Sequence, residues 1–137
     1  MSRDERGQAS ALLVGVLLLG LMVVGLGVDG ARMFTARRDL QNVADSAALA
    51  GASSLDEARY RSSGGAEVQL DPTAARAAIS EVLRAAELPQ LVAVDVRVEP
   101  DRVEVRLRRP VHPLFLGLAG MRAQTIGAHA SAAPQTG

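Results

Sequence analysis

The first part of the chain is a continuous apolar run with almost no polar positions. From Gly7 to Val28 there are 22 consecutive uncharged residues, and large aliphatic side chains cover every face of a helix drawn through them. As an α-helix the run is about 33 Å long, enough to cross a hydrocarbon core of about 30 Å. Charged residues close it on both sides, Arg6 before it and Asp29 after it. The pattern predicts a transmembrane helix over residues 8–28.

A cleaved secretory signal is the rival interpretation of this run. Signal peptides usually have about 7–15 apolar residues followed by a small-x-small cleavage site. This run is longer, and the V-D-G-A sequence at residues 28–31 is a poor site, so we expect a retained anchor. Charge alone leaves the orientation open, because two arginines precede the run and Arg32, Arg37 and Arg38 follow it closely.

The helical pattern continues beyond the apolar run. Residues 31–52 lack proline, are rich in alanine and place apolar side chains at helical spacing. We therefore expect one helix over residues 8–52, and Gly51 followed by Ser53 and Ser54 is the signal for its end. Small residues four apart predict a smooth surface that lets another backbone approach closely, although helix propensity alone explains the same alanines equally well. This surface consists of Ala44, Ala47, Ala48 and Gly51.

Residues within and just after the apolar run are further candidate contacts for a partner helix. The small pairs are Ala11 with Gly15 and Gly27 with Ala31, and the charged pair is Asp29 with Arg32. The charged residues are three apart on the predicted helix. They therefore form either an interfacial ion pair or a docking point for another pilin-like helix.

The middle of the chain predicts a loop followed by a second helix. Residues 53–70 contain the S-S-G-G sequence and are expected to form the loop. Asp71 can cap the next helix, and Pro72 suits its first position. One face of this helix is apolar, and Pro89 marks its end.

Two alternating arms then predict a β-hairpin. Valines alternate with Ala93 and charged residues over 92–99, and Val103, Val105 and Leu107 alternate with charged residues over 102–108. Proline cannot adopt positive φ, so Pro100 excludes the usual primed two-residue turns. The remaining turns place Val98 opposite Val103. The same register sets up the pairs Val96–Val105, Val94–Leu107, Arg97–Glu104 and Asp95–Arg106, and the last two are expected to attract across the strands.

The C-terminal part completes the predicted fold class. Residues 111–120 are apolar but too short to span a membrane, and they either pack on the sheet or lie at the lipid surface. Residues 122–132 allow a third strand with Ile126, Ala128 and Ala130 in phase. We expect an α+β, pilin-like protein: a long N-terminal transmembrane helix that extends out of the membrane, a second helix and a small antiparallel sheet. The expected parts are a cytoplasmic tail (1–7), the transmembrane helix (8–28), its extension (29–52), a loop (53–70) and an extracytoplasmic α+β domain (71–137).

Composition narrows the function classes. The 137 residues carry 15 basic and 15 acidic side chains, with aromatic residues at 2% and no cysteine. This argues against nucleic-acid binding, thiolate metal sites and cysteine chemistry. A lone histidine is usually a surface or satisfied core residue, and we interpret His112 and His129 in this way. We therefore expect no enzyme, no cofactor, no metal site and no small-molecule substrate.

Three short motifs carry a family resemblance. They are R-G-Q-A at residues 6–9, V-D-G-A-R at 28–32, and A-R-R-D-L-Q-N-V-A-D-S-A-A-L-A at 36–50. With the apolar run between them, they resemble the Flp pilus-assembly TadE/TadG-like family over residues 6–52. The resemblance implies a bacterial single-pass protein of the cytoplasmic (inner) membrane with its C-terminal part outside. It also implies a minor pilin-like or assembly factor of the tight-adherence pilus, which acts with a secretion ATPase and a membrane platform.

A departure from the family pattern lies at the start of the apolar helix. Relatives processed by a prepilin peptidase have a glycine before the helix and a glutamate five residues later. Gly7 fits the glycine, but Leu12 stands where the glutamate would be. The expected partners are membrane lipid and other pilin-like or Tad pilus-assembly proteins. The alternative is an envelope-localised binding module with an uncleaved signal anchor, unrelated to pili.

Overall fold

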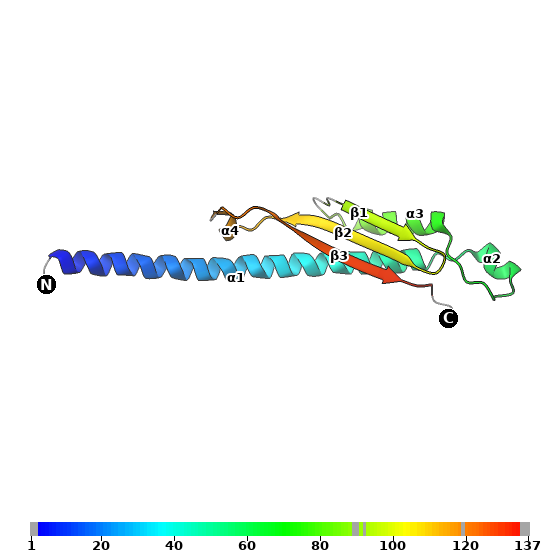
Figure 1. The fold of residues 1–137 in the computed structure, drawn as a ribbon, viewed down its shortest axis with the longest axis horizontal. Helices are drawn as coiled ribbons and strands as arrows, with labels where there is room; N and C mark the ends of the chain where they lie inside the picture. The colour runs from blue at the N-terminus through cyan, green and yellow to red at the C-terminus, as the bar shows by residue number, and fades with distance from the viewer. Residues whose placement is uncertain (1–2, 89–90, 92, 119, 135–137) are drawn as a thin grey trace. The chain divides into compact units, whose positions relative to one another are not determined.

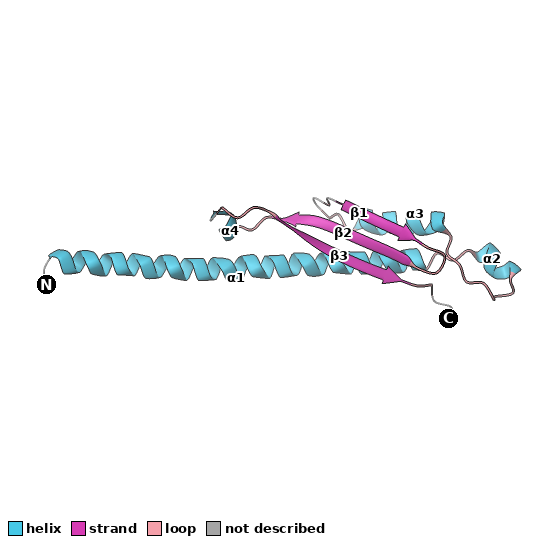
Figure 2. Ribbon diagram, viewed as in Figure 1, coloured by secondary structure: helices cyan, strands magenta, loops and turns pink. Residues whose placement is uncertain are grey.

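The computed structural model describes residues 3–88, 91, 93–118 and 120–134 (Figure 1). The described residues divide into two compact units. The first unit contains the described residues of Met1–Thr35 and His112–Gln124, and the second those of Ala36–Val111 and Thr125–Gly137. Figure 2 shows the helices and strands. In chain order they are α1 (Arg3–Ala52), α2 (Glu57–Ser62), α3 (Pro72–Ala85), β1 (Ala93–Val98), β2 (Val103–Val111), α4 (Phe115–Leu118) and β3 (Gln124–Ala132).

Helix α1 is continuous over 50 residues. The predicted helix over residues 8–52 is confirmed, and it begins earlier, at Arg3. A chain without proline and rich in leucine, valine and alanine keeps the helical hydrogen-bond ladder unbroken. The apolar part lies in the first unit, and residues 36–52 lie in the second.

The second unit is an α+β layer structure, as predicted. Its sheet has the strand order β1-β2-β3, and the arrows in Figure 1 alternate in direction. The predicted hairpin register is confirmed, since Val98 pairs with Val103, Val96 with Val105 and Val94 with Leu107. The predicted third strand is β3, with the three expected side chains turned inward. The buried face of the sheet consists of Val103, Val105, Leu107, Ile126, Ala128 and Ala130.

The small residues of α1 lie beneath this sheet. Ala44 and Ala47 are fully buried, and the predicted smooth surface packs within the protein's own core. A Cβ atom placed on Gly51 would lie 2.8 Å from Cδ1 of Ile79 and 3.2 Å from Cγ1 of Val103. Small side chains are therefore what allows α1, α3 and β2 to approach so closely.

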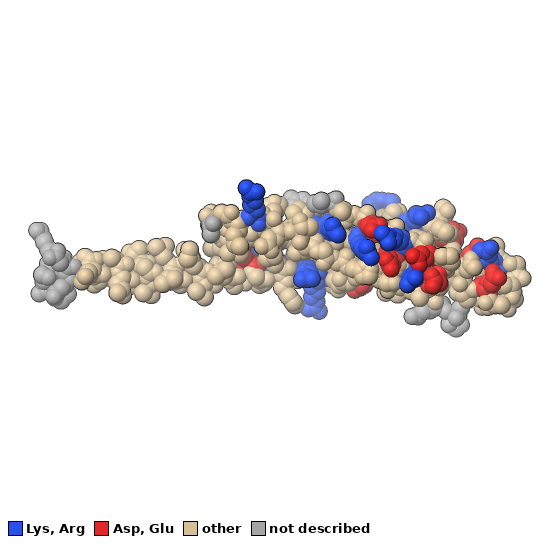
Figure 3. Space-filling model, viewed as in Figure 1, with Lys and Arg blue, Asp and Glu red and all other residues tan. Residues whose placement is uncertain are grey.

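The charged side chains that face each other on β1 and β2 form ion pairs with neighbours on their own strand. Arg97 lies 4.0 Å from Asp95, and Arg106 lies 3.5 Å from Glu104. The expected partners were the opposite charges across the hairpin, which the register does bring face to face. A flexible guanidinium on an exposed face can reach either neighbour, so facing position alone does not select the partner. Figure 3 shows charged side chains gathered over this part of the second unit.

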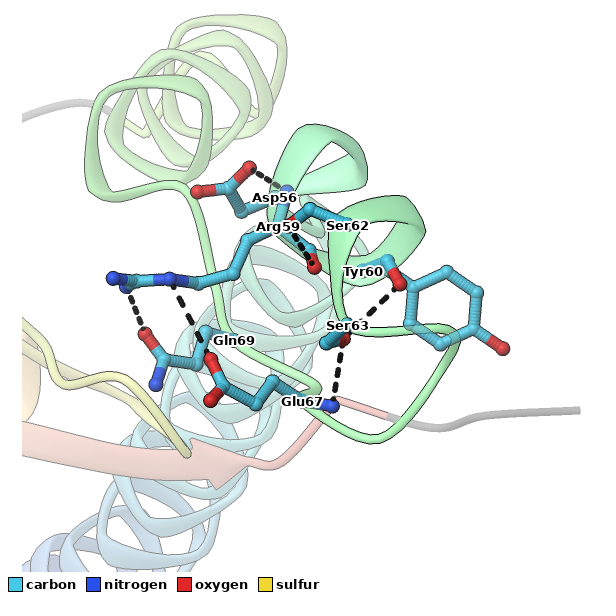
Figure 4. Close-up of polar contacts among 7 residues, drawn as sticks. All are labelled: Asp56, Arg59, Tyr60, Ser62, Ser63, Glu67 and Gln69. Atoms are coloured by element: carbon cyan, nitrogen blue, oxygen red, sulfur yellow. Dashed lines mark hydrogen bonds and ion pairs between the residues drawn. The ribbon is translucent and has the colours of Figure 1, made fainter.

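The segment expected to be a loop over residues 53–70 contains the short helix α2 (Figure 4). The Asp56 side chain accepts a hydrogen bond from the Arg59 backbone N–H at 3.0 Å, which caps the helix. Glu57 pairs with Arg61 one turn later. The Arg59 guanidinium lies 3.7 Å from the Glu67 carboxylate. This ion pair connects α2 to the loop segment that follows it.

Helix α3 begins as predicted. The Asp71 side chain accepts hydrogen bonds from the N–H groups of Thr73 and Ala74, and Pro72 is the first helical residue. The helix ends at Ala85, and Glu87 follows with a positive φ of 43°. The predicted stop at Pro89 lies outside the described residues, as do Val92 of the first hairpin arm and the end of the tail, residues 135–137.

Candidate functional site

The first unit contains a buried carboxylate that holds α4 against α1. Asp29 is 1% exposed. One carboxylate oxygen accepts a hydrogen bond from the Leu114 N–H and the other from the Leu116 N–H, each at 2.8 Å. These donors belong to the start of a helix, where backbone N–H groups have no partner within the helix. Asp29 therefore fixes a segment that lies 85 residues away in sequence.

Electrostatics favour the ionised form of this carboxyl. Burial raises the pKa of Asp29, but the N–H groups at residues 114–116 and the nearby positive charge of Arg32 lower it more, so the net pKa lies below the ordinary value. Both expected roles of Asp29, an interfacial ion pair with Arg32 or a docking point for another helix, stay predictions, and the hydrogen bonds of its carboxylate are with the start of α4. Arg32 is exposed and contributes through its charge.

A glycine makes the close approach of α4 and α1 sterically feasible. A Cβ atom on Gly25 would lie 2.6 Å from Cγ and 2.8 Å from Cβ of Phe115, closer than real side chains come. Phe115 and its neighbours also border an apolar hollow of about 300 Å³. Its lining is Leu21, Met22 and Leu26 of α1 with Phe115, Leu116 and Leu118.

We expect Gly25→Ala to loosen α4, because the added methyl group would overlap the root of the Phe115 side chain. Overpacking of this kind costs about 1–3 kcal/mol. The measurement is amide hydrogen exchange of residues 112–121, with the full chain in detergent micelles. Gly27→Ala is the matched control, because its Cβ would meet nothing within 4 Å. Equal exchange in the two variants would contradict the contact.

The other candidate packing residues of the apolar part lie on its surface. Ala11, Gly27 and Ala31 are exposed, and Gly15 is half-buried. A Cβ on Gly15 or Gly27 would meet nothing within 4 Å. The structure thus leaves these small residues accessible, whereas it covers Ala44, Ala47, Ala48 and Gly51 within the core of the second unit. Gly7, the candidate processing residue, lies within α1 with open space around it.

A second hollow, of about 390 Å³, lies in the second unit and is lined by several arginines. Arg37 comes from α1, and Arg106 and Arg108 come from β2. Gln41 donates a hydrogen bond to the backbone carbonyl of His129 at 2.9 Å and so joins α1 to β3 at its rim. Sequence reasoning missed this cationic cluster, because its members are far apart in the chain.

The two histidines lie at the surface. His112 and His129 are both exposed, in agreement with the surface alternative of their interpretation. Across residues 3–88, 91, 93–118 and 120–134, no group of three or more acidic or histidine side chains is placed to hold a metal ion.

Sequence reasoning named Asp29 but missed its partner. The available signals were the apolar F-L-G-L stretch at residues 115–118 and the acidic residue at the end of the apolar run. Neither signal says that the two segments meet. The expectation for residues 111–120 left two alternatives, and the structure places α4 in the first unit with α1.

The fold defines a class of protein: a long apolar helix continues into a small α+β unit. Among the described residues, α1 is the one helix long and apolar enough to cross a membrane. Residues 7–54 match the family model described as "Putative Flp pilus-assembly TadE/G-like". The resemblance predicted from the sequence is therefore confirmed over this segment. Comparisons with curated proteins and with solved structures found no match.

Proposed function

We propose that the protein is a membrane-anchored, non-enzymatic component of a bacterial Flp/Tad-type pilus-assembly or secretion system, acting as a minor pilin-like or assembly factor. The observation that carries this proposal is the family match over residues 7–54. The match includes both the apolar run and the helix extension that packs beneath the sheet. The function therefore combines membrane residence with a folded unit that makes specific contacts.

Residues 8–28 serve as the membrane anchor in this proposal. Their aliphatic side chains are exposed, with Leu12 at 72% and Leu18 at 58%. So much apolar surface on one isolated helix is stable in lipid but unfavourable in water. The anchor lies in the cytoplasmic (inner) membrane as a single pass, and the C-terminal part is outside.

Contacts with other pilin-like helices use the small residues that the chain itself leaves uncovered. Two pairs spaced four residues apart, Ala11 with Gly15 and Gly27 with Ala31, offer places where another helix backbone can approach. Within a membrane such close packing is a main source of helix association, because lipid already surrounds the apolar side chains. The partners are therefore other pilin-like or Tad assembly proteins.

The test is deletion of the gene in its own host, followed by complementation. We expect fewer surface pili by electron microscopy, and recovery with the wild-type gene. A variant with Ala11→Leu and Gly15→Leu should complement poorly, whereas Leu12→Ala and Leu13→Ala on the same turns should complement. Unchanged piliation after deletion would overturn the pilus role and leave the alternative, an envelope-localised binding module.

Two further measurements on the same strain test the anchor and its processing. Protease added to intact spheroplasts should digest residues 60–137, and protection of this region would reverse the proposed orientation. The mature N-terminus decides whether Gly7 is a processing site. An N-terminus at residue 8 would place the protein with the peptidase-processed pilins despite Leu12.

A further inference from the structure

The α4 segment carries exposed apolar side chains that the proposed function does not use. Leu118 is 87% exposed, Leu114 54% and Met121 48%. The helix itself, F-L-G-L, has no polar side chain. An apolar cluster of this kind on a protein surface usually marks a contact with another protein or with a membrane.

The depth of α4 along α1 indicates which contact this is. Phe115 lies against Gly25, and the apolar hollow reaches back to Leu21. Counted from Val28, the end of the uncharged run, these positions are about 4.5 Å and about 10 Å back along the helix axis. Helix α4 therefore lies beside the last two turns of the predicted membrane span, so its exposed leucines continue the apolar surface of that span.

Several backbone polar groups of α4 have hydrogen-bond partners within the protein. Asp29 accepts hydrogen bonds from the N–H groups of Leu114 and Leu116. The chain after α4 closes on itself, since the Met121 N–H donates to the Leu116 carbonyl at 2.9 Å. Gly120 makes this reversal with a φ of 87°, which suits glycine. Backbone at membrane depth is tolerated only where its polar groups have such partners.

We infer that α4 is a second membrane contact, which dips into the leaflet next to the end of the span, where lipid chains cover Leu118 and fill the apolar hollow. This inference rests on the proposed anchoring of residues 8–28. Asp29 is a positioning residue that keeps the re-entrant segment against α1. Arg122 is exposed just after the segment, and we expect its guanidinium to reach lipid phosphates.

The chain has no cysteine, so a single introduced cysteine is the one thiol that a fluorophore can label. The variants Leu118→Cys, Leu18→Cys and Ala77→Cys are labelled with the fluorophore NBD. Each full-length protein is reconstituted into phosphatidylcholine–phosphatidylglycerol vesicles. Leu18 reports on the span, and Ala77 is exposed on α3 in the second unit. Quenching is measured with aqueous iodide and with lipids that carry a nitroxide at a shallow or a deep position.

We expect the Leu118 probe to be severalfold less quenched by iodide than the Ala77 probe, and quenched by the shallow nitroxide. Iodide quenching at Leu118 equal to that at Ala77, with a shielded Leu18 probe, would overturn the inference and leave the anchor intact. A Leu18 probe that the deep nitroxide does not quench would instead contradict the anchor itself.

A second copy of the chain is the rival occupant of this surface. A Leu118 probe shielded from iodide but not quenched by either lipid nitroxide would show a protein cover and overturn the inference. Adding Asp29→Asn to Leu118→Cys should raise iodide quenching toward the Ala77 level, since it weakens the hold on α4. Unchanged quenching in that double variant would contradict the positioning role of Asp29.

Discussion

Leu40→Ala is expected to destabilise the second unit by about 2–5 kcal/mol, because it removes a large side chain from a packed core and leaves a cavity. Leu40 is 0% exposed. It belongs to the same core cluster as Val105, Leu107 and Ile126 of the sheet. The measurement is pulse proteolysis in increasing urea, with the full chain in detergent micelles. It reports unfolding of the second unit while the apolar part of α1 stays in the micelle.

Leu49→Ala is the matched control on the same helix. Leu49 is 63% exposed, so its truncation should change stability by no more than about 0.5 kcal/mol. Both variants replace leucine by alanine within α1, and the two residues have similar helix propensities. A difference in helix propensity therefore does not contribute to the difference in stability between the variants. Similar urea midpoints for the two variants would mean that the sheet does not pack on α1 as described.

Asp29→Asn is expected to release α4. The carboxylate uses each of its oxygens as an acceptor, whereas asparagine would place an NH₂ donor against one of the two backbone donors. A backbone N–H left without an acceptor in a buried place is costly, so exchange of the Leu114 and Leu116 amides should become roughly ten- to hundredfold faster. Hydrogen exchange of residues 112–121 measures this. Asp39→Asn, at an exposed position of α1, should leave it unchanged.

Acid should act on α4 in the same direction as the Asp29→Asn substitution. The pKa of Asp29 is lowered in the folded protein. The carboxylate therefore contributes stability that is fully present above the ordinary aspartate pKa and is lost as the pH falls through the lowered value. Protection of the α4 amides should be flat around neutral pH and decline only in strong acid. A decline near neutral pH would contradict the ionised carboxylate.

Those parts of the protein that depend on local pattern could be predicted from the sequence. The length of the apolar run predicted a span, and Asp71 with Pro72 predicted the start of α3, which the structure confirms. The hairpin register followed from one proline and the two-residue period, because a slip by one position would turn every valine outward. The short helix α2 was missed because the S-S-G-G sequence favours a loop for the whole segment. Asp56 and Glu57 nevertheless carry a helix-start signal.

The sequence by itself determined the apolar run, the long helix α1, the start of α3 and the register of β1 with β2, because each of these depends on neighbouring residues and their period. Only the tertiary structure decided what the candidate packing residues contact. The alanine surface of α1 packs under its own sheet, and Asp29 binds amides from the far end of the chain. Contacts between residues 85 positions apart leave no periodic trace in one sequence, because they depend on how whole elements pack.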